Sequence, residues 1–418
     1  MDVESEIRKR IQERGRITFA EFMELALFWP RGGYYTNPDN IGPRGDFYTA
    51  PSAHPTFGAL LCVQVFQMWR LLDCPPTFWL VEMGAGDGLL CHDLVSYSVH
   101  LPQGFQDALR YLCLDRRVAL LEDRRRVERL AAHGIPLRRI EGCFFSNELV
   151  DSFLVHRVTM TNGALKEVYL TLKDGKLVEV LDSPSTPALE ERLASLGVSL
   201  TEGFSAEINL AMGPWMEETS SALKRGFLLT IDYGHPATEL YSQRRRRGTL
   251  TCFHRHAQTD NPYVRIGRQD ITAQVDFTSL IEEGRRRGLE PLGFNTQREF
   301  LHNLGLRELM ARLPAMGLNQ REVEANRLGM LDIVRPGGMG EFKVLAQGKG
   351  VGTPPLWGFG PAAAGAQHAA PLLEAVLEGL PVPLLTPRHM PLLEGRYPHL
   401  ASFDLERLWP EQDHKFAR

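Results

Sequence analysis

The chain begins with apolar residues at helical spacing and then changes to a repeated pattern of strand and helix. Residues 3–28 predict two helices separated by Gly15. A long segment rich in glycine, proline and tyrosine follows, and residues 60–72 predict an apolar helix. From residue 78 apolar strand patterns alternate with helical ones, which is typical of a parallel sheet covered by helices.

Short apolar runs identify the strands of this sheet. The run at 111–115 is followed by charged residues that predict a helix to about His133. Helical sequence also fills 277–287 and lies between the last two strand patterns. The predicted strands are FWLV (78–81), YLCLD (111–115), GCFFSNELVD (142–151), GFLLTIDYG (226–234), LEPLGFNTQ (289–297) and EFKVLAQ (341–347).

A different pattern interrupts the alternation. Residues 155–180 predict an antiparallel hairpin or meander, with turns at Asn162-Gly163 and Asp174-Gly175. Helices are predicted at 187–196 and 206–224, and a polar loop is predicted to reach Asp270. The predicted fold is therefore a doubly wound α/β sheet. Its expected organisation is a helical cap and loop (1–75), a core (76–350) with an insertion at about 155–220, and a C-terminal extension (351–418) without a recognisable motif.

The segment VEMGAGDG places Gly84, Gly86 and Gly88 where the first strand of this sheet meets the next helix. Open α/β sheets bind ligands at such turns. A dinucleotide or ATP loop holds a phosphate there, and Asp87 would repel that phosphate. S-adenosylmethionine has no phosphate but carries an ammonium and a sulfonium, which Glu82 and Asp87 would favour. The alternative is a tight turn in which Asp87 only caps a helix.

The next strand ends in another acid. Asp115 lies 27 positions after Gly88, where a nucleotide-binding α/β sheet places the acid that binds ribose. Asp115 could also simply end its strand. The order of strand, glycine loop, helix and acidic strand end favours a cofactor site over chance.

The strand at 142–151 ends in polar residues at the sheet edge that faces the ligand. Asn147, Glu148 and Asp151 lie there, and a helix starting at this point would bring the two acids onto one face. Such a pair could hold a guanidinium or position a hydroxyl. The alternative is a pair of solvent-exposed acids at a helix start.

Methyl transfer from a sulfonium is an in-line displacement in which alignment and electrostatics supply much of the catalysis. A base is needed only if the acceptor carries a proton. Candidates for a general acid or base are Asp232, Tyr233, His256 and Asp270. A histidine in a loop, however, more often makes a structural hydrogen bond.

The motifs together resemble the MidA-type S-adenosylmethionine-dependent methyltransferases, a family that includes the mitochondrial complex I assembly arginine methyltransferase. The resemblance implies a Rossmann-like class I methyltransferase fold, and it places Asp46 and Thr49 of the early loop near the cofactor and substrate. It also implies a protein arginine acceptor, which Glu148 and Asp151 would suit. The matching residues are 33–35, 45–47, Thr49, 57–58, 82–88, 147–149, Asp151, 231–234, 248–250, Cys252, His256, Gly267, 269–272, 275–277 and 342–345.

Composition limits the partners. The 418 residues carry a net charge of −4, so no global basic field favours nucleic acid or an acidic membrane. The arginines of 124–126 and 285–287 are expected on solvated helix faces, and the loop run 244–247 is left open between an acidic partner and solvent. Six cysteines without CxxC spacing favour a reducing compartment and no metal site. The N-terminal residues mix acids with bases, so a cytoplasmic protein is expected.

The leading hypothesis is a cytoplasmic methyltransferase that uses S-adenosylmethionine and acts on protein arginine. Glu82, Gly84, Gly86, Asp87, Gly88, Asp115, Asn147, Asp46 and Thr49 are predicted to bind the cofactor, and Glu148, Asp151 and His256 to act on the acceptor. Alternatives are a small-molecule acceptor, or an assembly factor that binds the cofactor and acts through protein contacts. Asp87 disfavours an NAD oxidoreductase. The sequence does not define the oligomeric state, and a homodimer is one of the alternatives.

Overall fold

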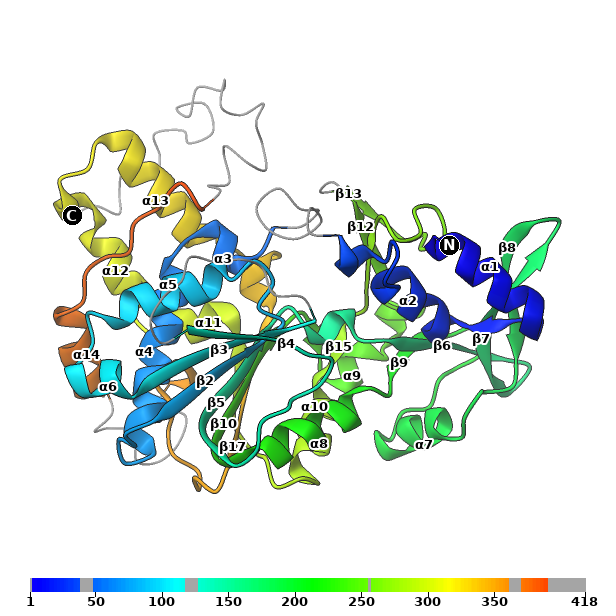
Figure 1. Cartoon of the computed structure of the whole chain (residues 1–418), viewed down its shortest axis with the longest axis horizontal. Coiled ribbons are helices and arrows are strands. Elements are labelled where there is room, and N and C mark those ends of the chain that lie inside the picture. The colour runs from blue at the N-terminus through cyan, green and yellow to red at the C-terminus, as the bar shows by residue number, and fades with distance from the viewer. Residues whose placement is uncertain (1, 38–47, 117–126, 255–256, 361–369, 390–418) are drawn as a thin grey trace.

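A central sheet of seven strands, in the order β16-β17-β10-β5-β2-β3-β4, dominates the computed structural model, which describes residues 2–37, 48–116, 127–254, 257–360 and 370–389 (Figure 1). The first five strands in chain order are parallel, whereas β17 runs antiparallel to both β10 and β16. The predicted doubly wound α/β sheet is confirmed. Its strands are β2 (Phe78–Met83), β3 (Leu109–Asp115), β4 (Val127–Ala131), β5 (Ile140–Asn147), β10 (Leu223–Asp232), β16 (Glu290–Thr296) and β17 (Lys343–Lys349).

The strands are apolar on both faces because each face of the sheet contributes to a separate core. In β2, Leu80 belongs to the core that includes α4 and α5, whereas its neighbour Val81 belongs to the core that includes α8 and α10. Burial on both sides explains why these strands read as continuous apolar runs. The helices that cover the sheet are α4 (Thr56–Leu71), α5 (Leu89–Ser98), α6 (Gln103–Ala108), α8 (Met212–Ala222) and α10 (Phe277–Arg285).

The N-terminal helices pack on the predicted insertion and form a lobe beside the central sheet (Figure 1). The turn between β6 and β7 has positive φ at both Asn162 (+54°) and Gly163 (+70°), as a two-residue hairpin requires. The predicted meander is therefore confirmed. The elements of this lobe are α1 (Val3–Arg14), β1 (Ile17–Thr18), α2 (Phe19–Phe28), β6 (Val155–Thr161), β7 (Ala164–Lys173), β8 (Lys176–Asp182), α7 (Ala188–Ser195) and β9 (Ser205–Asn209).

Two predicted helices are wrong over part of their length. Residues 127–131 form the edge strand β4 instead of ending a charged helix, and residues 117–126 lie outside the described part of the chain. An edge strand can keep charged side chains at exposed positions, so its charge pattern resembles that of a helix. The predicted helix 206–224 divides into β9 and α8, because the Asn209 side chain accepts hydrogen bonds from the backbone N–H groups of Ala211 (2.9 Å) and Met212 (3.2 Å).

The predicted polar loop before Asp270 also contains short strands. A three-stranded sheet joins β12 (Thr251–His254), β13 (Ala257–Thr259) and β14 (Asp270–Thr272). Strands of three or four residues are too short to display a hydrophobic period. The other elements of this region are β11 (Gly234–His235), α9 (Ala237–Leu240) and β15 (Val275–Asp276).

The described part of the C-terminal region packs on the central core. The buried His389 side chain lies 2.9 Å from Asp93 on α5, joining Nε2 to Oδ2. Arg312 donates a hydrogen bond to the carbonyl oxygen of Leu377 (3.0 Å), and Leu377 and Leu380 belong to the same core as α4. The remaining helices are α3 (Ala50–Ala53), α11 (Gln297–Asn303), α12 (Leu306–Arg312), α13 (Gln320–Asp332) and α14 (Ala370–Glu378).

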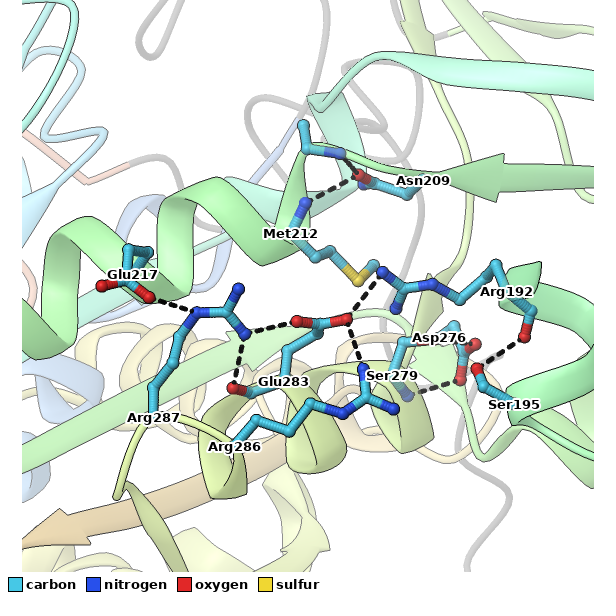
Figure 2. A network of polar contacts seen from close by, with 11 residues as sticks. Arg192, Ser195, Asn209, Met212, Glu217, Asp276, Ser279, Glu283, Arg286 and Arg287 are labelled. Atoms are coloured by element: carbon cyan, nitrogen blue, oxygen red, sulfur yellow. Dashed lines mark hydrogen bonds and ion pairs between the residues drawn. The ribbon is translucent and has the colours of Figure 1, made fainter. Parts of the chain in front are cut away.

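A buried glutamate connects the lobe to the core (Figure 2). Glu283 on α10 is 5% exposed and pairs with Arg192 of α7 at 2.8 Å. Arg286 (3.1 Å) and Arg287 contact the same carboxylate, and Arg287 also contacts Glu217 at 2.9 Å. The prediction of a solvated face is therefore wrong for Arg287, because this guanidinium turns toward a buried acid.

Candidate active site

A cavity of about 420 Å³ lies at the carboxyl ends of β2, β3 and β5, the edge at which doubly wound sheets bind ligands. Its volume is within the range of small-molecule sites, roughly 300–1,000 Å³. The N-terminal lobe supplies one wall and α8 another. The lining residues include Phe28, Tyr35, Thr49, Glu82, Gly84, Gly86, Asp87, Asp115, Arg116, Asn147, Glu148, Phe153, Trp215 and Glu218.

The glycine loop needs glycine for its backbone conformation. Gly84, Gly86 and Gly88 have φ values of +76°, +54° and +77°, which residues with a side chain rarely adopt. A Cβ atom at Gly84 would lie only 2.8 Å from Leu149 Cδ1. Gly84 and Gly86 therefore line the cavity with backbone that carries no side chain, and a side chain at Gly84 would collide with Leu149.

The two acids beside the glycines, Glu82 and Asp87, form hydrogen bonds within the fold and also line the cavity. Asp87 Oδ1 accepts a hydrogen bond from Leu89 N (3.1 Å), the first N–H of α5, although Gly88 is the N-cap residue of that helix. Asp87 also lines the cavity. Glu82 is 4% exposed and accepts a hydrogen bond from the Tyr111 hydroxyl at 2.7 Å. Burial is the main cause that raises the pKa of each carboxyl.

Asp115 holds the middle of the glycine loop from the next strand. Its Oδ2 accepts a hydrogen bond from Gly86 N at 3.0 Å, and it lines the same cavity. Asp115 therefore does more than end its strand. Arg116, which follows it, lies over the ring of Phe28 with 3.7 Å between the guanidinium carbon and the ring centroid.

Glu148 faces the cavity from a left-handed backbone conformation, with φ of +52°. Asn147 Nδ2 donates a hydrogen bond to its Oε1 at 3.1 Å. Burial and the neighbouring charge of Asp151 raise the pKa of Glu148 to about 8. This carboxyl is therefore a stronger base than an ordinary glutamate.

Asp151, unlike Glu148, does not line the cavity. It is 6% exposed, and burial raises its pKa to about 6 although the nearby Tyr233 hydroxyl opposes this shift. The residues around it form the short 3-10 turn η3 (Val150–Ser152) instead of the longer helix considered from the sequence. The two acids nevertheless interact electrostatically.

An aromatic pair from the N-terminal lobe completes the wall near the acids. The rings of Phe28 and Tyr35 stack with centroids 5.4 Å apart, and the Tyr35 hydroxyl donates a hydrogen bond to Asp270 Oδ1 at 2.9 Å. Burial, followed by the charges of Asp270 and Asp151, raises the pKa of Tyr35. Asp270 thus reaches the site through Tyr35, more than 200 residues away in the sequence.

The structure brings most of the predicted site residues to one cavity. Glu82, Gly84, Gly86, Asp87, Asp115, Asn147, Glu148 and Thr49 line it. Gly88 and Asp151 adjoin this set without lining the cavity, and Asp46 and His256 lie outside the described residues. The sequence interpretation missed Phe28, Arg116, Phe153 and Trp215 as lining residues, because no motif distinguishes them from core residues. Tyr35 belonged to a matching motif but had no assigned role.

These residues suit a cationic cofactor without phosphate. Gly84 and Gly86 line the cavity without side chains, so a ligand can approach their backbone closely, and Glu82, Asp87 and Asp115 give the surroundings negative character. Asn147 Oδ1 is buried and has no hydrogen-bond partner in the described part of the chain, so it can accept one from a ligand. Within the described ranges, no group of three or more His, Cys, Asp or Glu side chains could hold a metal ion.

Residues 60–295 match a family described as S-adenosyl-L-methionine-dependent methyltransferases. The "Protein arginine methyltransferase NDUFAF7, mitochondrial" of Mus musculus is 29% identical over 337 residues, covering 71% of this chain and 72% of that protein. The Drosophila melanogaster homolog is 28% identical over 382 residues, covering 83% and 84%.

Solved structures give the same relationship. A Burkholderia thailandensis protein crystallised with bound S-adenosyl-homocysteine superposes with a TM-score of 0.76 and 29% sequence identity. The superposition covers 88% of this chain and 96% of that one. The similarity therefore includes the N-terminal lobe and the central sheet together.

These relatives correct the predicted cytoplasmic location. The curated relatives are named as mitochondrial proteins, which contradicts that prediction. Six free cysteines do not distinguish between compartments that are reducing. Among the described helices, none is both long and apolar enough to cross a membrane.

Proposed function

We propose, on the premise that the chain belongs to the S-adenosyl-L-methionine-dependent methyltransferase family, that it methylates the guanidinium group of an arginine in a protein. The protein is a methyltransferase and S-adenosylmethionine is its cofactor. The acceptor is the proposed part. Relatives named protein arginine methyltransferases support it, as does the chemistry of the cavity.

The observation that carries the proposal is a set of buried carboxyl groups without a cationic partner. Burial and the charge of Asp151 raise the pKa of Glu148, and burial and the charges of Asp151 and Glu148 raise that of Asp232. Burial raises the pKa of Asp151, and no lysine or arginine of the described chain pairs with these three carboxyls. Arg116, which lines the same cavity, lies over Phe28. Buried acids that lack a counter-ion favour binding of a cation, and a planar guanidinium can take two hydrogen bonds to a carboxylate.

The side chains at this end of the cavity suit such an acceptor. Tyr35, whose ring stacks on Phe28, provides an aromatic wall for a planar cation. Glu148, with its pKa of about 8, can bind the guanidinium and accept the proton that its nitrogen loses on methylation. The cofactor supplies the methyl group as a sulfonium. Asp151 would support Glu148 electrostatically.

We assign the cofactor to the glycine-loop end of the cavity. Glu82, Gly84, Gly86, Asp87, Gly88, Asp115, Asn147 and Thr49 would hold it. The roles of Asp46 in cofactor binding and His256 in catalysis rest on the family resemblance. This division leaves Glu148 between the cofactor end and the aromatic wall.

Replacing Gly86 with valine is expected to abolish cofactor binding. The backbone at this position has φ of +54°, and a branched side chain would both strain the loop and occupy the space beside Asp115. Isothermal titration with S-adenosyl-homocysteine should show a loss of at least about 100-fold in affinity. Gly163→Val, in the exposed hairpin turn, is the matched control at another positive φ and should keep the affinity. Unchanged binding by Gly86→Val would contradict the site assignment.

The class of acceptor can be tested with methyl-labelled cofactor. The purified protein and its Glu148→Gln variant are incubated with lysate of a strain that lacks this gene, and protein is separated from small molecules. Label in protein with the wild type, and none with the variant, is expected. Label only in small molecules would replace the proposal with a small-molecule acceptor, and cofactor binding without any transfer would favour an assembly role.

A further inference from the structure

We propose that Asp232 is a positioning residue for methyl transfer, because its carboxylate fixes the backbone that presents Glu148 to the cavity. The inference rests on the proposed role of Glu148. Asp232 is the last residue of β10 and is fully buried. It does not line the cavity, so it acts on the reaction only through its neighbours.

The Asp232 carboxylate accepts hydrogen bonds from the backbone N–H groups of the segment that follows Glu148. Its Oδ2 accepts hydrogen bonds from the amides of Leu149 (3.1 Å), Val150 (2.8 Å) and Asp151 (3.3 Å). Its Oδ1 accepts one from Tyr233 N at 2.9 Å. Three successive amides can point at one oxygen only if the chain curls around it, as it does in the 3-10 turn η3.

This curl determines the direction of Glu148. The residue must adopt its left-handed conformation, with φ of +52°, to lead from β5 into the turn. A non-glycine residue in that region costs free energy and persists only when the surrounding contacts enforce it. Glu148 N donates to the carbonyl oxygen of Ile231 at 2.9 Å, so strand β10 holds both sides of the strained residue.

The same segment also touches the glycine loop. Leu149 lies so close to Gly84 that a Cβ atom there would be 2.8 Å from Leu149 Cδ1. On its other side, the carbonyl oxygen of Asp151 accepts a hydrogen bond from Ala273 N at 3.0 Å. A shift of the turn would therefore move Glu148 relative to the cofactor loop, and a misplacement of about 1 Å can cost about 100-fold in rate.

Asp232→Asn is the test variant, because the amide keeps the size of the side chain but places an N–H donor where backbone donors converge. We expect kcat to fall about 10- to 100-fold, whereas the dissociation constant for S-adenosyl-homocysteine should change less than about threefold. A purely structural role would lower the melting temperature without this selective loss of kcat. Thr230→Val is the matched control, since Thr230 is equally buried on β10 and its hydroxyl has no partner in the described chain.

Amide hydrogen exchange tests the positioning independently of activity. In the wild type, the amides of Leu149, Val150 and Asp151 should be protected, and in Asp232→Asn they should exchange at least about tenfold faster. Unprotected amides in the wild type, or unchanged kcat in the variant, would overturn the proposal even if arginine is methylated. If the wild type methylates no arginine, protected amides and their loss in the variant would still support the positioning role, and only the proposed acceptor would fail.

Discussion

Glu148→Gln is expected to reduce methyl transfer at least about 100-fold while making the protein more stable at pH 8. The Glu148 carboxyl lines the cavity, and glutamine cannot accept the proton that a guanidinium releases. Cofactor affinity should remain, because the glycine loop is unchanged. In the wild type, kcat/KM should rise as the pH increases through about 8, the pKa of Glu148 in the free enzyme.

The gain in stability follows from the raised pKa. The pKa of Glu148 increases from 4.5 in the unfolded chain to about 8 in the folded protein. The folded state therefore binds more protons between these values, and the wild type loses stability as the pH rises from 4.5 to about 8. Glutamine does not ionise. The free energy of unfolding of the variant should therefore exceed that of the wild type by a few kcal/mol at pH 8 and be about equal to it at pH 4.5.

Denaturant unfolding at the two pH values, combined with a transfer assay, checks this prediction. Glu128→Gln, at an exposed position on the edge strand β4, is the control and should change neither property. A Glu148→Gln variant that is fully active would remove Glu148 from the mechanism. A variant that is less stable than wild type at pH 8 would show that the carboxylate is stabilised by contacts in the fold.

Glu283→Gln is expected to lower the free energy of unfolding by about 3–5 kcal/mol, the largest stability loss among these variants. The change removes the negative charge that Arg192, Arg286 and Arg287 surround, and Arg192 and Arg287 remain mostly buried. Arg192 belongs to the lobe and Glu283 to the core (Figure 2). The substitution should therefore also weaken the contact between the lobe and the core.

The neighbouring glutamate provides the control. Glu282 pairs with Arg285 at 2.8 Å, but both side chains are about half exposed, so Glu282→Gln should cost less than about 1 kcal/mol. Urea unfolding at pH 7 measures both variants. Equal effects of the two substitutions would contradict a special role for the buried network.

The glycine loop and the acids at the strand ends could be predicted because the sequence features that identify them lie close together along the chain. Gly84, Gly86 and Asp115 occupy positions that the strand-and-helix alternation already defines, and they meet at one cavity. The edge strand β4 was missed because its charged exposed positions resemble a helix. Likewise, the sequence did not reveal that Asp232 supports the Glu148 turn, since that contact spans more than 80 residues.

The wall formed by the N-terminal lobe illustrates the same limit. Tyr35 reaches Asp270 across more than 200 residues, and Trp215 lines the cavity from a helix whose start was predicted several residues too early. Such contacts depend on how the lobe packs against the sheet. The polar side chain of Asn209, the last residue of β9, accepts hydrogen bonds from the backbone N–H groups just before and at the start of α8, and is a local signal that would have corrected the helix boundary.

The most direct test of the proposed function is to identify the methylated amino acid. Protein labelled by the purified enzyme and methyl-labelled S-adenosylmethionine is hydrolysed, and the labelled amino acids are separated by chromatography. Methylarginine that is formed by the wild type and by Thr230→Val, but not by Glu148→Gln, is the expected result. Label in lysine, histidine or a carboxyl ester instead of arginine would contradict the proposed guanidinium acceptor.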